Sequence, residues 1–195
     1  MMAQGAVFLD RDGTLNEEVG YLHRIEDFCW IPGARKAVRS INRAGLLAIV
    51  VTNQAGVAHG YYGEATVRRL HAHMQASLKE AGAHLDAFYY CPYHPQARLD
   101  QYRRRSTYRK PNTGMFQQAL EDWSVSFANS YVVGDRNTDI EPGRMLGMTT
   151  LLVATGYGDQ EKGTTSADHI VADIGAAVEI ILQRKGIQCK SQRKH

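Results

Sequence analysis

Two carboxylates stand two positions apart directly after a short apolar run. Asp10 and Asp12 follow the run at residues 6–9, and Gly13 comes next. Because glycine permits a sharp turn, the chain can leave the run here and point both acids into one crevice. Two like charges held together are costly unless a cation offsets them, and Mg²⁺ takes one or two carboxylates while keeping positions for water and phosphate. The pair therefore indicates a metal-linked phosphate site, although acidic turns also occur without any metal.

Polar side chains also follow two later apolar runs. Residues 52–54 read Thr-Asn-Gln and offer a hydroxyl and two amides, which suit a phosphoryl group but are also ordinary turn residues. Asp135 and Asp139 follow the run at residues 131–134, where acids can equally cap the next helix. Lys110 adds a cation. If these segments meet, four acids, an amine and a hydroxyl surround one point.

The elements that must position these residues alternate along the chain. Short runs rich in β-branched and aromatic residues predict strands at residues 6–9, 46–52, 87–91, 131–134 and 149–154, with a weaker one at 169–172. Helical spacing of apolar residues predicts helices over 34–41, 67–78, 115–123 and 177–182. Apolar strands that alternate with helices indicate a parallel sheet covered on both faces. We therefore expect a doubly wound α/β fold with its site beyond the carboxyl ends of the strands.

The segment at residues 92–109 breaks this alternation. It shows little periodicity and sets five arginines against one acid, Asp100; the arginines are Arg98, Arg103, Arg104, Arg105 and Arg109. Loops of this length are usually functional or disordered. A solvated surface loop is the alternative interpretation. Because the segment runs into Lys110 just before a predicted helix, we favour a loop that presents cations to an anion.

The net charge of +3 comes from the end of the chain. Five of the 23 lysines and arginines lie in residues 183–195, which contain no acid, so the rest carries 18 basic against 20 acidic residues. We interpret this end as a frayed terminus rather than a nucleic-acid-binding arm. The 195 residues predict one domain over residues 1–186 and a basic, disordered tail over residues 187–195.

Three scattered cysteines are too few for a disulfide framework and indicate a reducing compartment. The first nine residues lack a basic flank and a long apolar run, and no stretch of the chain is apolar enough to span a bilayer. We expect a cytoplasmic, monomeric protein that does not interact with membranes.

As a set, these residues resemble the haloacid dehalogenase superfamily of phosphotransferases. The resemblance covers residues 6–155 and is carried by Asp10-x-Asp12-Gly13-Thr14, Thr52, Lys110 and Gly134-Asp135-x-x-x-Asp139, in that order. It implies a Rossmann-like parallel sheet. The segments between the motifs leave no room for a large cap domain, so substrate choice must depend on the loops at residues 16–27, 55–63 and 92–109.

The resemblance also implies roles for individual residues. Asp10 would be the nucleophile that forms an aspartyl-phosphate, and Asp12 would serve the leaving group as general acid and then water as general base. Mg²⁺ would bind Asp10, Asp135 and the backbone carbonyl of Asp12, with Asp139 in support. Thr52 and Lys110 would hold the transferred phosphoryl group.

Within the superfamily, the chain is most similar to the D-glycero-D-manno-heptose 1,7-bisphosphate 7-phosphatases and the related histidinol-phosphate phosphatases. Further shared residues include Gly20-Tyr21, Ala55-Gly56-Val57, Cys91-Pro92-Tyr93-His94-Pro95 and Arg109-Lys110-Pro111. The resemblance implies that substrate is contacted by Glu18, Val19, Gly20, Tyr21, Asn53, Gln54, Arg109 and Arg136.

The arginine-rich loop favours the heptose bisphosphate, since Arg109 can grip a second phosphate in a bidentate way. Histidinol phosphate carries an amine and no second phosphate. A nucleic-acid 3′-phosphatase is a further alternative, but the body of the chain is near neutral and lacks interleaved aromatic and basic residues, so we expect a small phosphorylated sugar and no nucleic acid. A non-catalytic anion-binding protein is the last alternative, and the presence of both Asp10 and Asp12 argues against it, because binding alone needs no nucleophile.

The chain departs from the family at one point. Members commonly bind a structural zinc through Cys-x-His and Cys-x-Cys, but here these positions read Cys91-Pro92-Tyr93 and Ser106-Thr107-Tyr108. Even with His94 this is half of a four-ligand site, so we expect no zinc. His71 and His73 lie two apart on a predicted helix, and we interpret both as surface residues.

Overall fold

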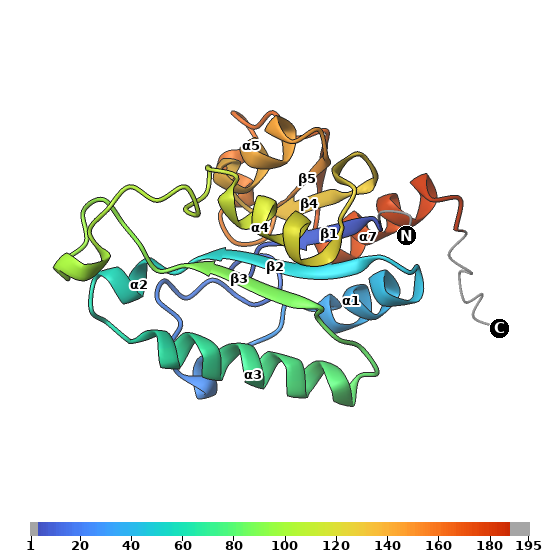
Figure 1. Ribbon diagram of the computed structural model, residues 1–195. Coiled ribbons are helices and arrows are strands. Elements are labelled where there is room, and N and C mark those ends of the chain that lie inside the picture. The colour runs from blue at the N-terminus through green and yellow to red at the C-terminus, as the bar shows by residue number, and fades with distance from the viewer. Residues whose placement is uncertain (1–3, 188–195) are drawn as a thin grey trace.

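The computed structural model describes residues 4–187, which fold around a six-stranded, fully parallel sheet in the order β3-β2-β1-β4-β5-β6 (Figure 1). The strands are β1 (Ala6–Leu9), β2 (Leu47–Asn53), β3 (Ala87–Cys91), β4 (Tyr131–Gly134), β5 (Thr149–Val153) and β6 (His169–Val171). The predicted doubly wound α/β fold is confirmed. The predicted tail at 187–195 lies, except for Ile187, outside the described residues, so the domain boundary stays a prediction.

Helices cover both faces of the sheet. They are α1 (Ala34–Arg43), α2 (Ala55–Ala58), α3 (Glu64–Glu80), α4 (Gly114–Trp123), α5 (Asn137–Met145), α6 (Gly158–Glu161) and α7 (Ile174–Arg184), with 3₁₀ turns at Ile25–Asp27, Asp100–Tyr102 and Phe127–Asn129. Helices α1, α3 and α7 pack on one face, and α4 and α5 pack on the other. The four predicted helices correspond to α1, α3, α4 and α7. The single-turn helices α2 and α6 are too short to produce a periodic pattern.

The central strands are buried on both sides, which explains their continuous apolar sequence. In β1, Ala6 and Phe8 point into the core under α4, whereas Val7 and Leu9 point into the core under α1 and α7. Phe8 meets Phe116 of α4 with ring centroids 5.0 Å apart. The strand therefore has fixed neighbours on both faces, and the residue that follows it leaves the sheet in a defined direction.

The register of the sheet brings three strand ends together. Leu9, the last residue of β1, pairs with Val50 of β2 and with Val133 of β4. The chain winds from β1 outward to β3 and then returns to β4 on the other side of β1, so a crevice opens where the winding reverses. Asp10 lies directly at this point, and its backbone N–H donates to the carbonyl of Val133 at 2.9 Å.

No inserted domain lies between the elements of residues 4–187, which agrees with the predicted lack of a large cap. The connection from β3 to α4 is long and extends beyond the sheet beside α2 (Figure 1). Among the helices of the described chain, none combines the length and the apolar character that crossing a bilayer requires.

The structure corrects one expectation on α3. His71 is 6% exposed and stacks on Phe88 of β3 with ring centroids 4.4 Å apart, so its interpretation as a surface residue is wrong. Position 71 is four residues after Val67 and three before Met74, so the helical spacing itself places His71 on the apolar face, and the prediction went wrong by judging it on its polarity. Burial lowers the pKa of His71 to about 3, with the positive charge of Arg11 adding to the effect.

This pKa predicts a pH-dependent stability. His71 stays neutral when folded but takes up a proton below about pH 6.5 when unfolded, so its contribution is fully present above that pH and is lost as the pH falls toward 3. Between pH 7 and pH 5 the loss should be about 2 kcal/mol. His71→Phe keeps the stacking, so in urea denaturation its free energy of unfolding should no longer fall by this amount between pH 7 and pH 5. His73 is half-buried, and His73→Phe should still show the fall. Equal pH dependence in His71→Phe and wild type would contradict the prediction.

Candidate active site

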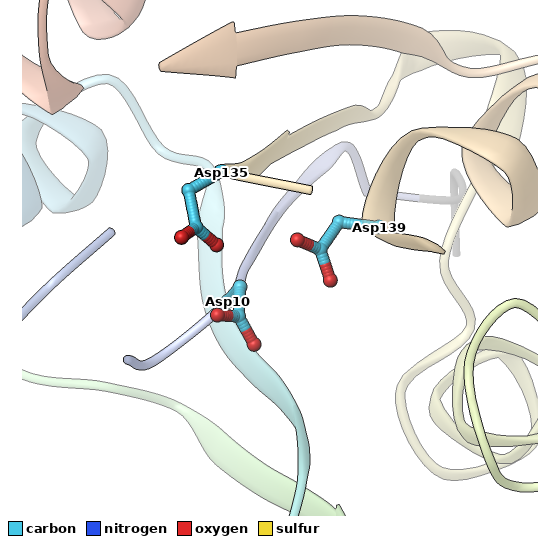
Figure 2. Close-up of side chains that lie close together, drawn as sticks. All are labelled: Asp10, Asp135 and Asp139. Atoms are coloured by element: carbon cyan, nitrogen blue, oxygen red, sulfur yellow. The ribbon is translucent and has the colours of Figure 1, made fainter. Parts of the chain in front are cut away.

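Three buried carboxylates converge at the carboxyl end of the sheet. Asp10 follows β1, Asp135 follows β4, and Asp139 lies in the first turn of α5. One oxygen of each lies within 4.8 Å of the others, and Figure 2 shows the three side chains turned toward a common space. The predicted meeting of these acids around one point is thus seen in the structure.

Glycines make room for Asp135. Gly13 and Gly156 both adopt positive φ, at +85° and +56°, which favours glycine. A Cβ atom built on either would collide with Oδ2 of Asp135. The same oxygen accepts a hydrogen bond from the backbone N–H of Tyr157 at 2.8 Å. The turn after β1 and the turn after β5 therefore fix the carboxylate between them.

Lys110 lies among these acids and uses all three of its protons. Its Nζ donates to Oδ1 of Asp10 at 2.7 Å, to Oδ1 of Asp139 at 2.6 Å and to the carbonyl of Val51 at 2.7 Å. Burial alone would lower the pKa of Lys110, but the two carboxylates outweigh it and raise the pKa above its ordinary value. The ammonium is therefore a fixed positive charge at the end of the sheet.

One lysine does not balance the negative charge. Burial raises the pKa of Asp10 to about 7 and that of Asp135 to about 8, and the neighbouring carboxylates add to both. Oδ1 of Asp135 is buried and has no hydrogen-bond partner among residues 4–187. Three carboxylates against one ammonium, with oxygen ligands only and one oxygen unpartnered, fit a hard divalent cation such as Mg²⁺.

The side chain of Asp12 has hydrogen-bond partners of its own. Its carboxylate accepts hydrogen bonds from Arg11, Asn16 and Gln54 at 2.7–3.1 Å. Its side chain is outside the group of three carboxylates. The Asp12 carboxylate is therefore not part of the acidic group, and a contact between its backbone carbonyl and the metal stays a prediction.

The three polar residues at the carboxyl end of β2, Thr52 and Asn53 in the strand and Gln54 directly after it, have distinct surroundings. Thr52 lines the cavity described below, and its hydroxyl accepts a hydrogen bond from Nε2 of Gln54 at 2.9 Å. Gln54 is buried, and its carbonyl oxygen accepts from the hydroxyl of Tyr62 at 3.0 Å. Asn53 forms two hydrogen bonds of 3.1 Å with the backbone N–H and C=O of Lys110. The side chains of Asn53 and Gln54, which we expect to contact substrate, are thus also engaged in holding Lys110, Thr52 and Asp12.

These residues open into a cavity of about 380 Å³. Its walls include most of the predicted site residues: Asp10, Asp12, Glu18, Gly20, Tyr21, Thr52, Asn53, Gln54, Arg109, Lys110, Arg136 and Asp139. Two predicted residues are not part of the wall. Val19 is 52% exposed, and Asp135 lies beneath the surface behind Gly13 and Gly156.

Cations and aromatic rings form other parts of the wall. Arg109 is half-buried and donates from Nη1 to the carbonyl of Tyr93 at 3.3 Å, while His94 and His59 lie side by side with ring centroids 5.0 Å apart. Arg136 lies over the ring of Tyr157 at 3.5 Å. Positive charge is therefore available in addition to Lys110.

The sequence assigns no individual role to several residues of the site; they are Arg11, Asn16, His59, Tyr62, Thr138 and Tyr157. Tyr157 follows β5, so extending the strand-end argument to the fifth strand would have indicated it. Tyr62 and His59 lie on a loop that only the fold brings back over Gln54.

The loop at residues 92–109 is held by side-chain contacts. Glu64 accepts hydrogen bonds from the hydroxyls of Tyr90 and Tyr102 at 2.7 and 2.9 Å, and Arg104 lies 3.6 Å over the ring of Tyr93. Cys91 is buried, and its thiol donates to the carbonyl of Tyr93 at 3.8 Å. These contacts describe how the loop is positioned, and the absence of zinc stays a prediction.

Comparison with known proteins identifies relatives over nearly the whole chain. A HAD-hydrolase-like family model matches residues 107–177. A D-glycero-D-manno-heptose-1,7-bisphosphate 7-phosphatase of Thermosynechococcus vestitus is 44% identical over 189 residues, covering 92% of this chain and 96% of that protein. The D-glycero-beta-D-manno-heptose-1,7-bisphosphate 7-phosphatase of Haemophilus ducreyi is 42% identical over 172 residues, covering 87% and 94%.

A solved structure is similar as well. The D,D-heptose 1,7-bisphosphate phosphatase of B. bronchiseptica, complexed with magnesium and phosphate, has a TM-score of 0.82 and 26% identity. The match covers 93% of this chain and 99% of that one.

The bonds between Asn53 and Lys110 predict a stability effect. Asn53→Ala removes both hydrogen bonds, so the free energy of unfolding should fall by about 2 kcal/mol, at about 1 kcal/mol for each bond. Urea denaturation of wild type and variant at pH 7 measures this. Asn112→Ala, which removes an exposed side chain from the connection between β3 and α4, should lower the free energy of unfolding by less. An unchanged stability in Asn53→Ala would show that the two bonds do not hold Lys110 in place.

Proposed function

This chain belongs to the heptose 1,7-bisphosphate 7-phosphatase family of HAD hydrolases, and from that premise we propose that it removes the C7 phosphate of D-glycero-D-manno-heptose 1,7-bisphosphate through an aspartyl-phosphate. The observation that carries this proposal is the convergence of Asp10, Lys110 and Asp135 at one end of the sheet, beside a further acid, Asp12. The reaction needs a carboxylate nucleophile, fixed positive charge and a proton carrier, and these groups supply all three.

Asp10 is the nucleophile in this proposal. Lys110 holds its Oδ1, which leaves Oδ2 to attack phosphorus as the bond to the sugar oxygen breaks. A carboxylate attacks an anionic phosphate poorly until cations screen the repulsion. Mg²⁺, when bound by Asp10, Asp135 and the backbone carbonyl of Asp12, supplies such screening and neutralises phosphate oxygens. Lys110 and the hydroxyl of Thr52 are the further donors to the transferred group.

Asp12 moves the proton. In the first step it gives a proton to the C7 oxygen of the departing sugar, and in the second it takes one from the water that attacks the aspartyl-phosphate. Its carboxylate lines the cavity and is tied to Arg11 and Gln54, away from Lys110. Asp139 supports the chemistry indirectly, since it holds the ammonium of Lys110 and caps α5 through the backbone N–H of Arg136.

The cavity wall supports a substrate with a second phosphate. Arg109 is half-buried and keeps guanidinium N–H groups beyond the one used by Tyr93, so it can bind a phosphate with two parallel hydrogen bonds. Glu18, Gly20, Tyr21 and Arg136 are the remaining wall residues that we assign to the sugar and its phosphates. We also infer a cytoplasmic monomer that uses no nucleic acid and no zinc.

Histidinol-phosphate phosphatase is the second candidate, because the sequence motifs are shared between the two groups. The named relatives favour the heptose bisphosphate. Purified enzyme with Mg²⁺ should therefore show a kcat/KM for heptose 1,7-bisphosphate at least about tenfold above those for fructose 1,6-bisphosphate and histidinol phosphate, a difference of about 1.4 kcal/mol. Phosphate release should stop in EDTA and return with excess Mg²⁺. A preference for histidinol phosphate would overturn the substrate assignment.

Two substitutions test the assigned chemistry. Asp10→Asn removes the attacking carboxylate and should abolish turnover. Lys110→Met removes one fixed donor and should lower kcat by about 10²–10³-fold. Glu179→Gln, which changes an exposed acid of α7 outside the cavity wall, should match wild type. Phosphate release and acid-trapped phosphoenzyme report the result, and turnover by Asp10→Asn would refute the covalent intermediate.

A further inference from the structure

Arg11, the residue between the two motif acids, is unusual for its burial. Its side chain is 1% exposed, which is rare for an arginine unless it is paired. It is not part of the cavity wall. A group this deeply covered cannot touch a substrate, so a role for Arg11 must act through a neighbour.

That neighbour is Asp12. The guanidinium donates from Nε to Oδ1 at 3.1 Å and from Nη2 to Oδ1 and Oδ2 at 2.9 and 2.7 Å. Asn16 adds a bond to Oδ1 and Gln54 adds a bond to Oδ2, both at 3.0 Å. Five hydrogen bonds from three buried side chains thus hold one carboxylate, whose own side chain keeps 16% of its surface exposed.

The backbone fixes these donors in turn. The carbonyl of Arg11 accepts from the N–H groups of Leu15 and Asn16 at 2.9 and 3.1 Å, so the turn after β1 holds both donors in one compact loop. Gln54 is anchored separately by Tyr62 and Thr52. The orientation of the Asp12 carboxylate is therefore determined by two parts of the chain that are distant in sequence.

We propose that Arg11 is a positioning residue that holds the Asp12 carboxylate ready to accept the proton of the attacking water when the aspartyl-phosphate is hydrolysed. The inference rests on the proposed function. In that step the water oxygen bonds to phosphorus, the bond from phosphorus to Asp10 breaks with its electrons returning to Asp10, and the water proton passes to Asp12. All five hydrogen bonds to the Asp12 carboxylate are donated to it by its neighbours, and together they fix its orientation at the cavity wall.

An aryl phosphate separates this step from the first one. Its leaving phenolate needs no proton, so formation of the phosphoenzyme should not depend on Asp12 or Arg11. Arg11→Lys keeps the positive charge but cannot donate three hydrogen bonds to two oxygens in the same geometry. With 4-nitrophenyl phosphate and Mg²⁺, this variant should release one equivalent of nitrophenol in a burst and then turn over about 10–100-fold more slowly than wild type. Acid quenching should show accumulated phosphoenzyme.

Arg39→Lys is the matched control, because Arg39 also donates to one internal acceptor, the carbonyl of Ala81, but lies away from the cavity. It should behave as wild type. Steady-state turnover of Arg11→Lys within twofold of wild type, or slow turnover without the burst, would overturn the proposal, since the second result places the damage in the attack by Asp10.

Gln54→Leu covers the case in which Arg11→Lys does not fold, because it removes a neutral donor from the same carboxylate. A burst followed by slow turnover supports the network, and normal turnover contradicts it. Wild-type enzyme that hydrolyses the aryl phosphate but not the heptose bisphosphate would contradict the substrate assignment alone. Absence of both activities would contradict the proposed function and this inference together.

Discussion

The ammonium of Lys110 lies between Asp10 and Asp139, and the arrangement of the site depends on this contact. Buried charges are tolerated only when paired, and removing one member of such a group leaves the others uncompensated. The lysine arrives from the loop after β3, whereas its partners follow β1 and begin α5. Its position therefore ties three separate segments to the same end of the sheet, with Asn53 holding its backbone from β2.

The fold was largely predictable because its sheet is buried on both faces. A strand with helices on either side must be apolar throughout, so the central strands appear in the sequence as short continuous runs. In a parallel sheet the carboxyl ends of all strands lie at the same edge, so the polar residues that follow the runs are placed there as well. Asp10, Thr52, Lys110 and Asp139 line one cavity, and Asp135 lies directly beneath it.

Side-chain partners were harder to predict, because they depend on loops that fold back. Nothing in the spacing of residues 52–54 distinguishes a side chain facing substrate from one bonded to Lys110 or Asp12. His71 has the spacing of the apolar face of α3, but its stacking on Phe88 of β3 is a contact between elements that this spacing does not show. The motif Asp10-x-Asp12 predicts nothing for its middle position, and only the packed turn reveals that Arg11 pairs with Asp12. Sequence periodicity reports which face of an element is apolar, and it carries little information about polar contacts between elements.

Gly13 and Gly156 face each other across Oδ2 of Asp135, although 143 positions separate them in the chain. Any side chain at either position would need the space that the aspartate oxygen occupies, on a backbone conformation that already favours glycine. Random mutagenesis should therefore find both sites intolerant together. A compensating change elsewhere has little scope, since the obstructing oxygen belongs to Asp135 of the site itself and each glycine lies against the backbone of the other.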